Sequence, residues 1–348
     1  MATGVAAGAA IVLAAASAHA AVTPGWRFVA VYPQVTSMQS VSATSAVNAW
    51  ATGLTFTSGP CYPCSLASHW NGEKWETLTP HLGGDYGLGA AVAAIPGGRA
   101  WVFLATWDGD SGLNDVAGAE WLGRSWSAVH DFGSLLPSGF IASGQDDVWA
   151  FGSDPAPYGV HFNGTTWTQL PMPVNQAAWS GTPAAGDWVL GTVVGQPAKV
   201  ELVHWAQGAW QNAILPRAIA VPAGDQMFPG LLAANTTADL WVTVTVGPAK
   251  GHGTVRTHLL HWNGKAWSQV AIPTLVNQNG IGGLASDGHG GAWAAISKLG
   301  MYHYSDGRWT HVPAPGSPNG SMELIPGTQS ILAPARATTG GAVLKYGP

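Results

Sequence analysis

The sequence contains few charged residues. Asp, Glu, Lys and Arg make up 9% of its 348 residues, and the formal net charge is -5; a globular domain usually has roughly a quarter. No basic patch is present, which argues against nucleic acid or an anionic membrane surface as a partner. After the first twenty residues, no apolar run reaches the roughly 18–20 residues of a membrane helix. We therefore expect no membrane span and a monomer.

Cysteine is also scarce, since the only two are Cys61 and Cys64 in the stretch "CYPC". In an exported protein this pair is expected to form one local disulfide that closes a loop. A thioredoxin-like redox pair would need a strand–helix context, which is missing here. A zinc site would need two more ligands nearby. Two free thiols are a further alternative.

The beginning of the chain resembles a secretory signal. Residues 1–20 contain an apolar run and end in Ala-His-Ala, a small-residue cleavage site before Ala21. The positive charge that normally starts a signal is absent, which leaves open a start further upstream or an Ala-rich leader. We expect residues 1–20 to be a signal peptide, residues 21–348 to be one domain, and the protein to be secreted.

Tryptophan and glycine are abundant, with 19 and 47 copies, and the tryptophans recur in a pattern. An aromatic residue is followed by a glycine-containing turn and then by a Trp five positions after the aromatic. Asn-Gly is a strong signal for a two-residue turn, so each unit predicts a β-hairpin. The six copies are Trp70–Trp75, Trp121–Trp126, Phe162–Trp167, Trp205–Trp210, Trp262–Trp267 and Tyr304–Trp309.

A second recurring unit precedes each hairpin, as in "NAWATG" or "DVWAFG", with a short apolar run some nine residues before its Trp. Together they give four short strands, A to D, in a period of about 40–50 residues without a helical pattern. This is typical of a β-propeller blade. Six tryptophans mark strand B, and Thr328–Ala333 is a degenerate seventh copy; the six are Trp50, Trp101, Trp149, Trp188, Trp241 and Trp293.

The seventh blade lacks its own strand D. The stretch "LKYG" at Leu344–Gly347 supplies a strand C with Tyr346 in the aromatic position, and the chain then ends. The stretch "GWRFVAVYP" at Gly25–Pro33 is an unassigned strand D with Trp26 in the expected place. We therefore predict an all-β, seven-bladed propeller closed by the N-terminal strand, because closure removes an unpaired sheet edge.

These units resemble those of secreted bacterial seven-bladed propellers of the Kelch and galactose-oxidase-like kind, on "DVWAFG", "HFNGTTW" and "HWNGKAW". The turn "YSDGRW" is similar to a degenerate Asp-box of sialidase-type propellers. The resemblance covers nearly all of residues 21–348 and implies the fold, while many activities occur on propellers. A galactose-oxidase copper site would imply a Tyr–Cys cross-link and further ligands, none of which can be assigned here.

Residues that recur at one position in most blades are expected to be structural, because the copies lie far apart around the ring. A histidine stands directly before the strand C aromatic in most blades. Such histidines cannot converge on one metal ion, and we expect each to bond a group between blades. They are His69, His161, His204, His261 and His303.

Site residues are instead expected where the blades differ. The D–A and B–C connections share one face, which we call the loop face, and the short A–B and C–D turns share the other, which we call the turn face. Trp107 has no place in the repeat, whereas Trp179 fits strand A. An aromatic ring beside carboxylates suits a sugar; the alternative is a Trp that covers a loop. The candidate ligand contacts are Trp107, Asp108, Asp110, Asp115, Asp85 and Tyr86.

No cofactor is expected. The acids after Trp107, with Asn114 among them, partly match a calcium loop, and Asp108, Asp110 and Asp115 would be its ligands. Calcium requires 6–8 oxygen atoms, and Gly112 stands where a third carboxylate is expected.

Three classes of function follow. The first is a non-catalytic module, secreted or on the cell surface, that recognises a glycan or a protein. The second is a sialidase-like glycosidase or a polysaccharide lyase, and the third is a structural cell-wall protein. If the protein is an enzyme, strand A supplies Glu323 at the central channel, and loops supply an acid and cations. The candidate catalytic residues are then Glu323, Asp131, Arg217, Arg256 and Arg336.

Overall fold

The computed structural model describes most of the chain outside its beginning. The described residues are 24–55, 64–78, 80, 82, 86–107, 114–133, 135, 137–152, 156–213, 215, 219–250, 254–274, 280–318 and 320–347, and of 64, 86–88, 107, 114 and 197 only the backbone is described. The expected signal and disulfide therefore lie outside the described parts.

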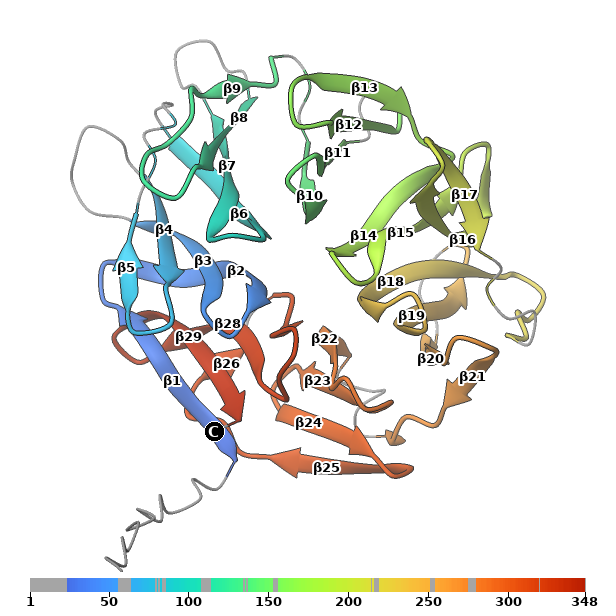
Figure 1. Cartoon of the computed structure of the whole chain (residues 1–348). Coiled ribbons are helices and arrows are strands. Elements are labelled where there is room, and N and C mark those ends of the chain that lie inside the picture. The colour runs from blue at the N-terminus through green and yellow to red at the C-terminus, as the bar shows by residue number, and fades with distance from the viewer. Residues whose placement is uncertain are drawn as a thin grey trace, which may run out of the picture.

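The described residues form seven antiparallel sheets around a central axis, as Figure 1 shows. The all-β seven-bladed propeller is confirmed. Each blade has four strands, counted A to D from the axis outward. Blade 1 consists of β2(Val35–Ser45), β3(Asn48–Thr55), β4(Cys64–Trp70) and β5(Trp75–Thr77), and blade 2 of β6(Tyr86–Ile95), β7(Arg99–Trp107), β8(Asn114–Trp121) and β9(His130–Asp131). Blade 3 consists of β10(Gly139–Gly144), β11(Asp147–Gly152), β12(Tyr158–Phe162) and β13(Trp167–Pro171), and blade 4 of β14(Val174–Thr182), β15(Gly186–Val193), β16(Gln196–Ala206) and β17(Ala209–Ala213). Blade 5 consists of β18(Asp225–Thr236), β19(Asp239–Pro248), β20(Arg256–Trp262) and β21(Trp267–Val270), and blade 6 of β22(Ile281–Ser286), β23(Ala292–Ile296), β24(Gly300–Ser305) and β25(Arg308–Val312).

Blade 7 is completed from both ends of the chain. Its strand A is split into β26(Ser317–Pro318) and β27(Glu323–Leu324), followed by β28(Ile331–Ala337) and β29(Gly340–Gly347). Its strand D is β1(Gly25–Tyr32), which pairs with β29 in the register Trp26↔Tyr346. The two segments, blue and red in Figure 1, lie side by side. The predicted closure is confirmed.

The C–D turns explain why the hairpins recur. In blade 1 the Asn71 side chain accepts hydrogen bonds from the backbone N–H groups of Glu73 and Lys74, and Gly72 has a φ of 98°. Asn163 and Asn263 form the same turn in blades 3 and 5. The asparagine side chain accepts the hydrogen bonds of the turn N–H groups, and the glycine that follows adopts the positive φ. The Asn-Gly signal in the sequence and the turn in the structure therefore agree.

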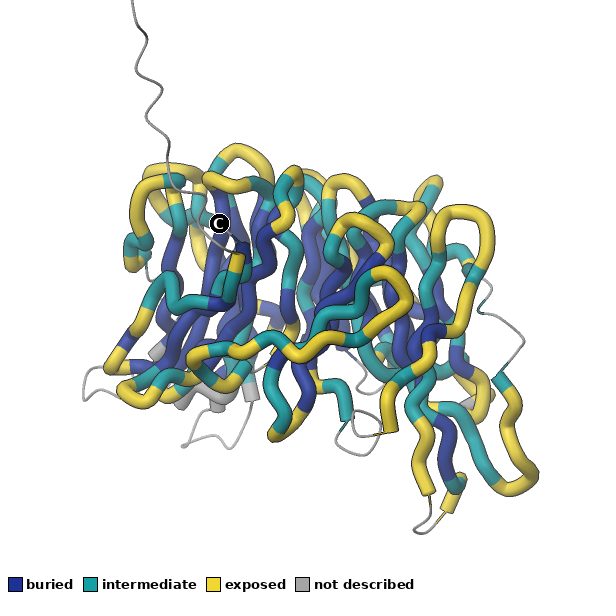
Figure 2. Tube along the Cα trace, turned by 90° about the horizontal axis from the view of Figure 1, so that it is seen from below, coloured by how far each residue is buried: buried dark blue, intermediate teal, exposed yellow. Residues whose placement is uncertain are grey.

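The strand B tryptophans hold neighbouring blades together. Trp149 is fully buried, and its ring lies 4.7 Å from Trp205 and 4.9 Å from Trp210 of the next blade, measured between centroids. Trp101 is held in the same way by Phe162 and Trp167. Trp50, Trp101 and Trp149 thus each contact both rings of the aromatic C–D pair of the following blade. In Figure 2 the buried residues accordingly occupy the middle of the strands, and the exposed residues gather at the two faces.

Blade 2 differs from the expected strand limits. In the predicted hairpin Trp121–Trp126, Trp126 makes only an isolated bridge to Trp121, and the outer strand β9 forms at His130–Asp131. Asp131 therefore lies in a strand rather than in a loop. Strand β7 extends to Trp107 and β8 begins at Asn114, so Trp107 and Asp115 lie in strands.

Candidate functional site

The turn face carries a repeated hydrogen-bond network rather than a metal site. In blade 3 the Asp147 carboxylate oxygen Oδ1 lies 3.1 Å from Trp149 Nε1, which donates to it, and 2.8 Å from His161 Nε2. The His161 ring also stacks on Trp149 at 4.3 Å. Blades 1, 5 and 6 bond their histidines in the same way to Asn48, Asp239 and Asp287. The expectation of bonds between blades was wrong, because each of these histidines bonds a side chain of its own blade.

Blade 2 reverses the charges of this network. Arg99 occupies the position of Asp147, two residues before the Trp, and Glu120 occupies the histidine position opposite Trp101. The Arg99 Nη2 and Glu120 Oε1 atoms are 2.6 Å apart. Burial raises the pKa of Glu120, and the adjacent Arg99 guanidinium acts in the opposite direction. The network position is therefore occupied by an ion pair that fixes the same two strands.

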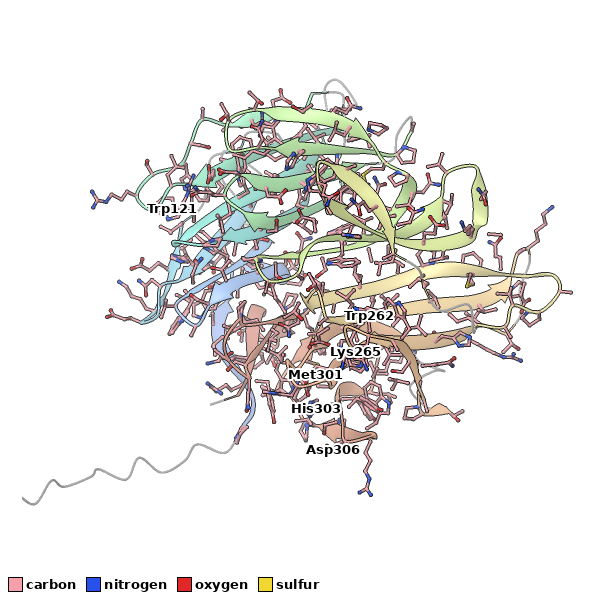
Figure 3. The ribbon with its side chains drawn as sticks, turned by 45° about the vertical axis from the view of Figure 1, so that its right-hand side comes forward. Trp121, Trp262, Lys265, Met301, His303 and Asp306 are labelled. Atoms are coloured by element: carbon pink, nitrogen blue, oxygen red, sulfur yellow. The ribbon has the colours of Figure 1, made fainter. Side chains whose placement is uncertain are left out.

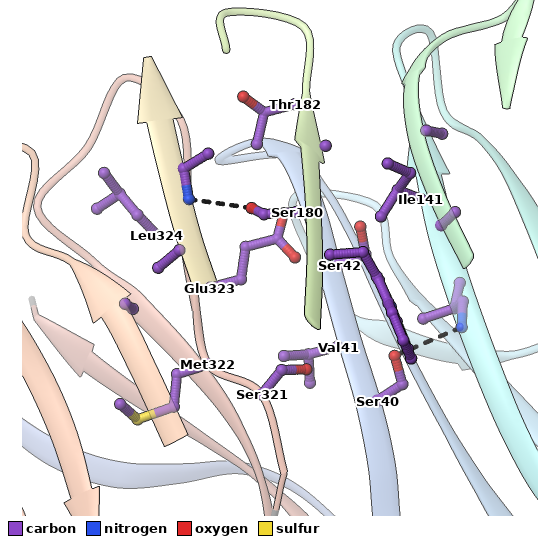
Figure 4. A pocket seen from close by; sticks show the side chains of 18 of the residues that line it. Ser40, Val41, Ser42, Ile141, Ser180, Thr182, Ser321, Met322, Glu323 and Leu324 are labelled. Carbon is purple, nitrogen blue, oxygen red and sulfur yellow. Dashed lines mark hydrogen bonds between the residues drawn. The ribbon is translucent and has the colours of Figure 1, made fainter. Parts of the chain in front are cut away.

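A cavity of about 550 Å³ occupies the central channel, lined by the inner strands of all the blades. Its described lining residues are mostly small, apolar or hydroxyl-bearing, with the amides Gln39 and Asn235, and Glu323 alone among them is charged. Figure 4 shows Glu323 projecting from its strand toward the space between the blades. The predicted position of Glu323 at the channel is confirmed.

Glu323 belongs to a ring of equivalent positions, each opposite the strand B Trp or its replacement Leu332. Glu323 Oε1 accepts a hydrogen bond from the backbone N–H of Ala43 in the next blade at 3.0 Å. The Ser180 hydroxyl does the same with Ala234 at 3.0 Å. Glu323 thus makes the inter-blade contact that a serine makes elsewhere. The ring consists of Ser42, Ala93, Ile141, Ser180, Ala233, Ala285 and Glu323.

The protonation of Glu323 nevertheless differs from that of an exposed glutamate. Burial raises its pKa to about 8, against 4.5 ordinarily, although hydrogen bonds from Ala43 and Ser42 favour the ionised form. The residue keeps intermediate exposure because it borders the channel. Near neutral pH this group is largely a neutral acid that is able to give up a proton.

A second cleft, of about 370 Å³, opens on the loop face between blades 1, 2 and 3. Gln39, Thr106, Asp115 and Ser138 contribute polar groups to its wall. Two stacked aromatic rings, Phe103 and Phe140, with centroids 3.8 Å apart, form its apolar part. The cleft therefore combines an aromatic surface with hydrogen-bonding groups.

Two carboxylates meet beside this cleft. Asp131 is paired with Ala117 across β8 and β9, and Asp115 lies two positions before Ala117, so both acids are on one face of the sheet. Burial raises the pKa of Asp115, and repulsion from the Asp131 carboxylate raises it further. This pairing was missed from the sequence, because β9 was taken for a loop.

The structure brings some of the predicted ligand residues together. Trp107 is the last residue of β7 and is paired with both Tyr86 and Asn114, and Thr106 is paired with Asp115. These residues share the loop-face end of blade 2, next to the cleft. Asp85, Asp108 and Asp110 lie outside the described residues, as does most of the proposed calcium loop.

The candidate catalytic residues are not assembled around Glu323. Arg256 begins β20 and Arg336 lies in β28; both are exposed, and neither lines the channel cavity. Arg217 lies outside the described residues. Asp131 belongs to the loop-face pair with Asp115, away from the channel lining.

Within the described parts of the chain, no group of three or more His, Cys, Asp or Glu side chains has an arrangement that could hold a metal ion. The same residues contain no helix long and apolar enough to span a membrane.

The fold is similar to several known propellers. A structure of YCF48 bound to D1 peptide aligns over 93% of this chain and 95% of its own, with a TM-score of 0.59 and 14% identity. YCF48 from Cyanidioschyzon merolae aligns over 93% of this chain and 99% of its own, with a TM-score of 0.56 and 14% identity. The propeller domain of the Trilobed protease from Pyrococcus furiosus aligns over 90% of this chain and 94% of its own, with a TM-score of 0.57 and 9% identity.

These likenesses show the fold alone. They are to YCF48 and to a protease propeller rather than specifically to Kelch or sialidase-type repeats, so the finer resemblance is not established. The sequence matches no protein-family model and no curated protein.

Proposed function

We propose that this protein is a secreted, non-catalytic binding module that holds a glycan at the loop-face cleft over blade 2. The observation that carries the proposal is the Asp115–Asp131 pair beside a wall of Gln39, Thr106 and Ser138. Carboxylates and amides accept and donate hydrogen bonds to sugar hydroxyls, and pockets of this type combine an apolar wall with a few polar groups. Trp107, at the end of the adjacent strand, is the proposed stacking residue.

A catalytic role has less support. Glycosidases generally use two carboxyl groups about 5–10 Å apart, whereas Glu323 is the one charged residue in the described channel lining. Its hydrogen bond to Ala43 is the one that Ser180 forms with Ala234. Two observations favour an enzyme: the pKa of about 8 at Glu323, a value suited to a general acid, and the raised pKa of Asp115 beside Asp131.

A protein ligand is the second binding candidate. YCF48, a propeller of similar architecture, has been observed with a bound D1 peptide. A peptide would be expected to make main-chain hydrogen bonds and to insert side chains along a groove. The loop-face cleft is compact and polar at one side, which favours a sugar ring over an extended chain. A purely structural role in the cell wall would require neither ligand.

A glycan array followed by titration calorimetry tests the proposal. Asp115→Asn should weaken binding of any glycan hit by about tenfold or more, because a buried hydrogen-bonding group at a binding site is typically worth 1–3 kcal/mol. Asp306→Asn is the matched control, since Asp306 is an exposed aspartate of the β24–β25 turn, labelled in Figure 3, on the opposite face. Absence of any glycan hit, or equal affinity of both variants, contradicts the proposal.

A further inference from the structure

Blade 4 departs from the repeated network of the turn face. Gly186 stands two residues before Trp188, where blades 1, 3 and 5 have Asn48, Asp147 and Asp239. Blade 6 also has a glycine there, Gly291, but its histidine is bonded by Asp287 from the preceding turn. Trp188 Nε1 consequently donates to the backbone carbonyl of Ala185, at 2.8 Å. His204 still stacks on Trp188 at 4.8 Å, but its buried Nδ1 atom has no hydrogen-bond partner. In the other blades the acceptor bonds histidine Nε2, and Gly186 offers His204 no side chain for that bond. Burial lowers the pKa of His204, and a hydrogen bond with the Gln211 backbone acts in the opposite direction.

The aromatic contact with the next blade is also missing here. At the other strand B tryptophans, rings of the following blade lie 4.2 to 6.5 Å away between centroids. Blade 5 carries the corresponding pair, Trp262 and Trp267, which contact each other at 5.7 Å. Within the described residues, however, the one ring in contact with Trp188 is that of His204. Trp262 and Trp267 pack against the hydrophobic cluster that contains Trp188, which is 7% exposed, but neither ring contacts the Trp188 ring.

A cleft of about 1090 Å³ occupies this gap. Trp188, His204 and Trp205 lie on the blade 4 side, and Trp262 and Trp267 lie on the blade 5 side. Figure 3 shows Trp262 with Lys265 on the β20–β21 hairpin, next to the β24–β25 hairpin of blade 6. The cleft is distinct from both the channel and the loop-face cleft, since it opens between the A–B and C–D turns.

Few polar side chains border the cleft. Its remaining lining is largely alanine and leucine, and the polar residues are His204, Thr237 and Asp187. Asp187 lies in β15 next to Trp188, so its side chain points to the opposite side of the sheet, where Ser143 Oγ donates to it at 3.2 Å. This leaves His204, Thr237 and the indole N–H groups of Trp205 and Trp267 as the groups that can bond a ligand. A sugar, which has a hydroxyl on most carbon atoms, would leave many of them unsatisfied.

We propose that this cleft binds a small molecule built on a flat aromatic ring system with one hydrogen-bonding group. The ring would lie between the Trp188–His204 pair and the Trp262–Trp267 pair and supply the stacking that the other interfaces make internally. The hydrogen-bonding group would bond His204 Nε2, the ring nitrogen that the other blades bond to a side-chain acceptor. The volume suits a ligand of drug size, since small-molecule sites are typically about 300–1,000 Å³ and mostly apolar.

The test uses 2-naphthol as the probe, with cyclohexanol and methyl β-D-glucopyranoside for comparison, in ligand-observed NMR and calorimetry. We expect 2-naphthol to bind and the other two to bind at least about tenfold more weakly, because they lack an aromatic face. Absence of 2-naphthol binding overturns the proposal, and so does tighter binding of the glucoside, which would instead assign the cleft to a sugar.

Trp262→Ala locates the site, with Trp70→Ala as its matched control. The two tryptophans occupy the same strand C position, and each donates its Nε1–H to a backbone carbonyl of its own blade, Thr237 or Ala46. Only Trp262 lines the cleft. We expect Trp262→Ala to weaken 2-naphthol binding about tenfold or more and Trp70→Ala to change it less than about twofold. Equal effects of the two variants contradict the proposal.

Gly186→Asn provides a variant that removes no core side chain. It would restore the acceptor that Asn48 offers to Trp50 and His69 in blade 1. Gly186 has a φ of 71°, which asparagine tolerates best among other residues, and no atom lies within 4 Å of its added Cβ. With His204 bonded within the protein, 2-naphthol affinity should fall about tenfold while the melting temperature is retained. Unchanged affinity in a folded variant would exclude His204 as the ligand's partner.

Discussion

Trp26 and Tyr346, which lie near opposite ends of the chain, are directly opposite each other across β1 and β29, with ring centroids 5.6 Å apart. Both rings contact Trp293 of blade 6, at 5.3 and 4.2 Å. The two chain ends therefore form the same aromatic pair that the C–D hairpins form elsewhere. Ring closure uses the contact that joins most of the other neighbouring blades, and it depends on a strand that is remote in sequence.

Removal of the residues through Tyr32 should open the ring. The deletion leaves the β29 edge unpaired and removes Trp26, which is 7% exposed. Burial of a large aromatic is worth about 3–5 kcal/mol, and an exposed strand edge promotes association. We expect a lower melting temperature and self-association in light scattering. A truncated protein that stays monomeric with the melting temperature of the full chain would contradict this.

The ion pair of blade 2 should behave as a replacement for the Asp–His pair. Arg99→Ala leaves Glu120, which is 4% exposed, without its counter-ion, and breaking a buried pair costs about 3–5 kcal/mol. The double variant Arg99→Asn with Glu120→His rebuilds the Asn48–His69 arrangement and should recover most of that loss. Urea unfolding of both variants measures the effect. Failure of the double variant to exceed the single one in stability would show that blade 2 cannot accept the common network.

Much of the fold was predictable because it is repeated. Because a tryptophan and an Asn-Gly turn recur along the chain, the strand order and spacing can be inferred from several copies independently. Ring closure followed from a strand D that is missing in the last blade and an unassigned strand near the beginning of the chain. The position of Glu323 was predictable for the same reason, since strand A is located by its distance from strand B.

The candidate sites were less predictable, because they depend on departures from the repeat. The Asp115–Asp131 pair arises from β9, a strand of two residues without a pattern of its own. Beside Trp188, blade 4 has Gly186 at the position of Asp147 and no acceptor from the preceding turn such as Asp287 in blade 6. That glycine was visible in the sequence, but its meaning required knowledge that Asp147 and Asp239 bond both the Trp and the His. The turn face was therefore taken to be uniform.

The Asp–His networks should make the protein sensitive to acid. Burial opposes ionisation of Asp239, but hydrogen bonds from His261, Ser286 and Asn235 outweigh it, so the pKa of Asp239 lies below the ordinary 3.8. A depressed carboxyl pKa contributes stability that is present above the ordinary value and is lost as pH falls through the folded-state value. Asp239→Asn should therefore show a shallower loss of urea midpoint below pH 4 than the wild type.

The control for this acid profile is Asp306→Asn, in an exposed turn. Its midpoint should follow the wild-type curve at each pH. If Asp239→Asn also follows the wild-type curve below pH 4, the network does not hold Asp239 in its ionised form.

Glu323 should give the opposite dependence on pH. Its pKa is about 8 in the folded protein and 4.5 ordinarily, with burial as the main cause. Between these values the folded state binds more protons than the unfolded state, so stability falls as pH rises through this window. Below the window the group is neutral in both states and contributes no difference. Above it the penalty is complete, with an upper bound of about 5 kcal/mol, which water in the channel reduces.

Glu323→Gln removes this dependence and keeps an oxygen that accepts the hydrogen bond from Ala43. We expect urea midpoints close to the wild type at pH 4.5 and a variant that is more stable than the wild type by a few kcal/mol at pH 9. Ser180→Ala is the matched control, because it loses the equivalent bond to Ala234 without removing a titratable group. It should lower stability by about 1 kcal/mol at every pH. If the Glu323→Gln and wild-type curves stay parallel from pH 4.5 to 9, the Glu323 carboxyl ionises in the folded protein as it does in water, and the observation favouring an acid catalyst at this position is lost.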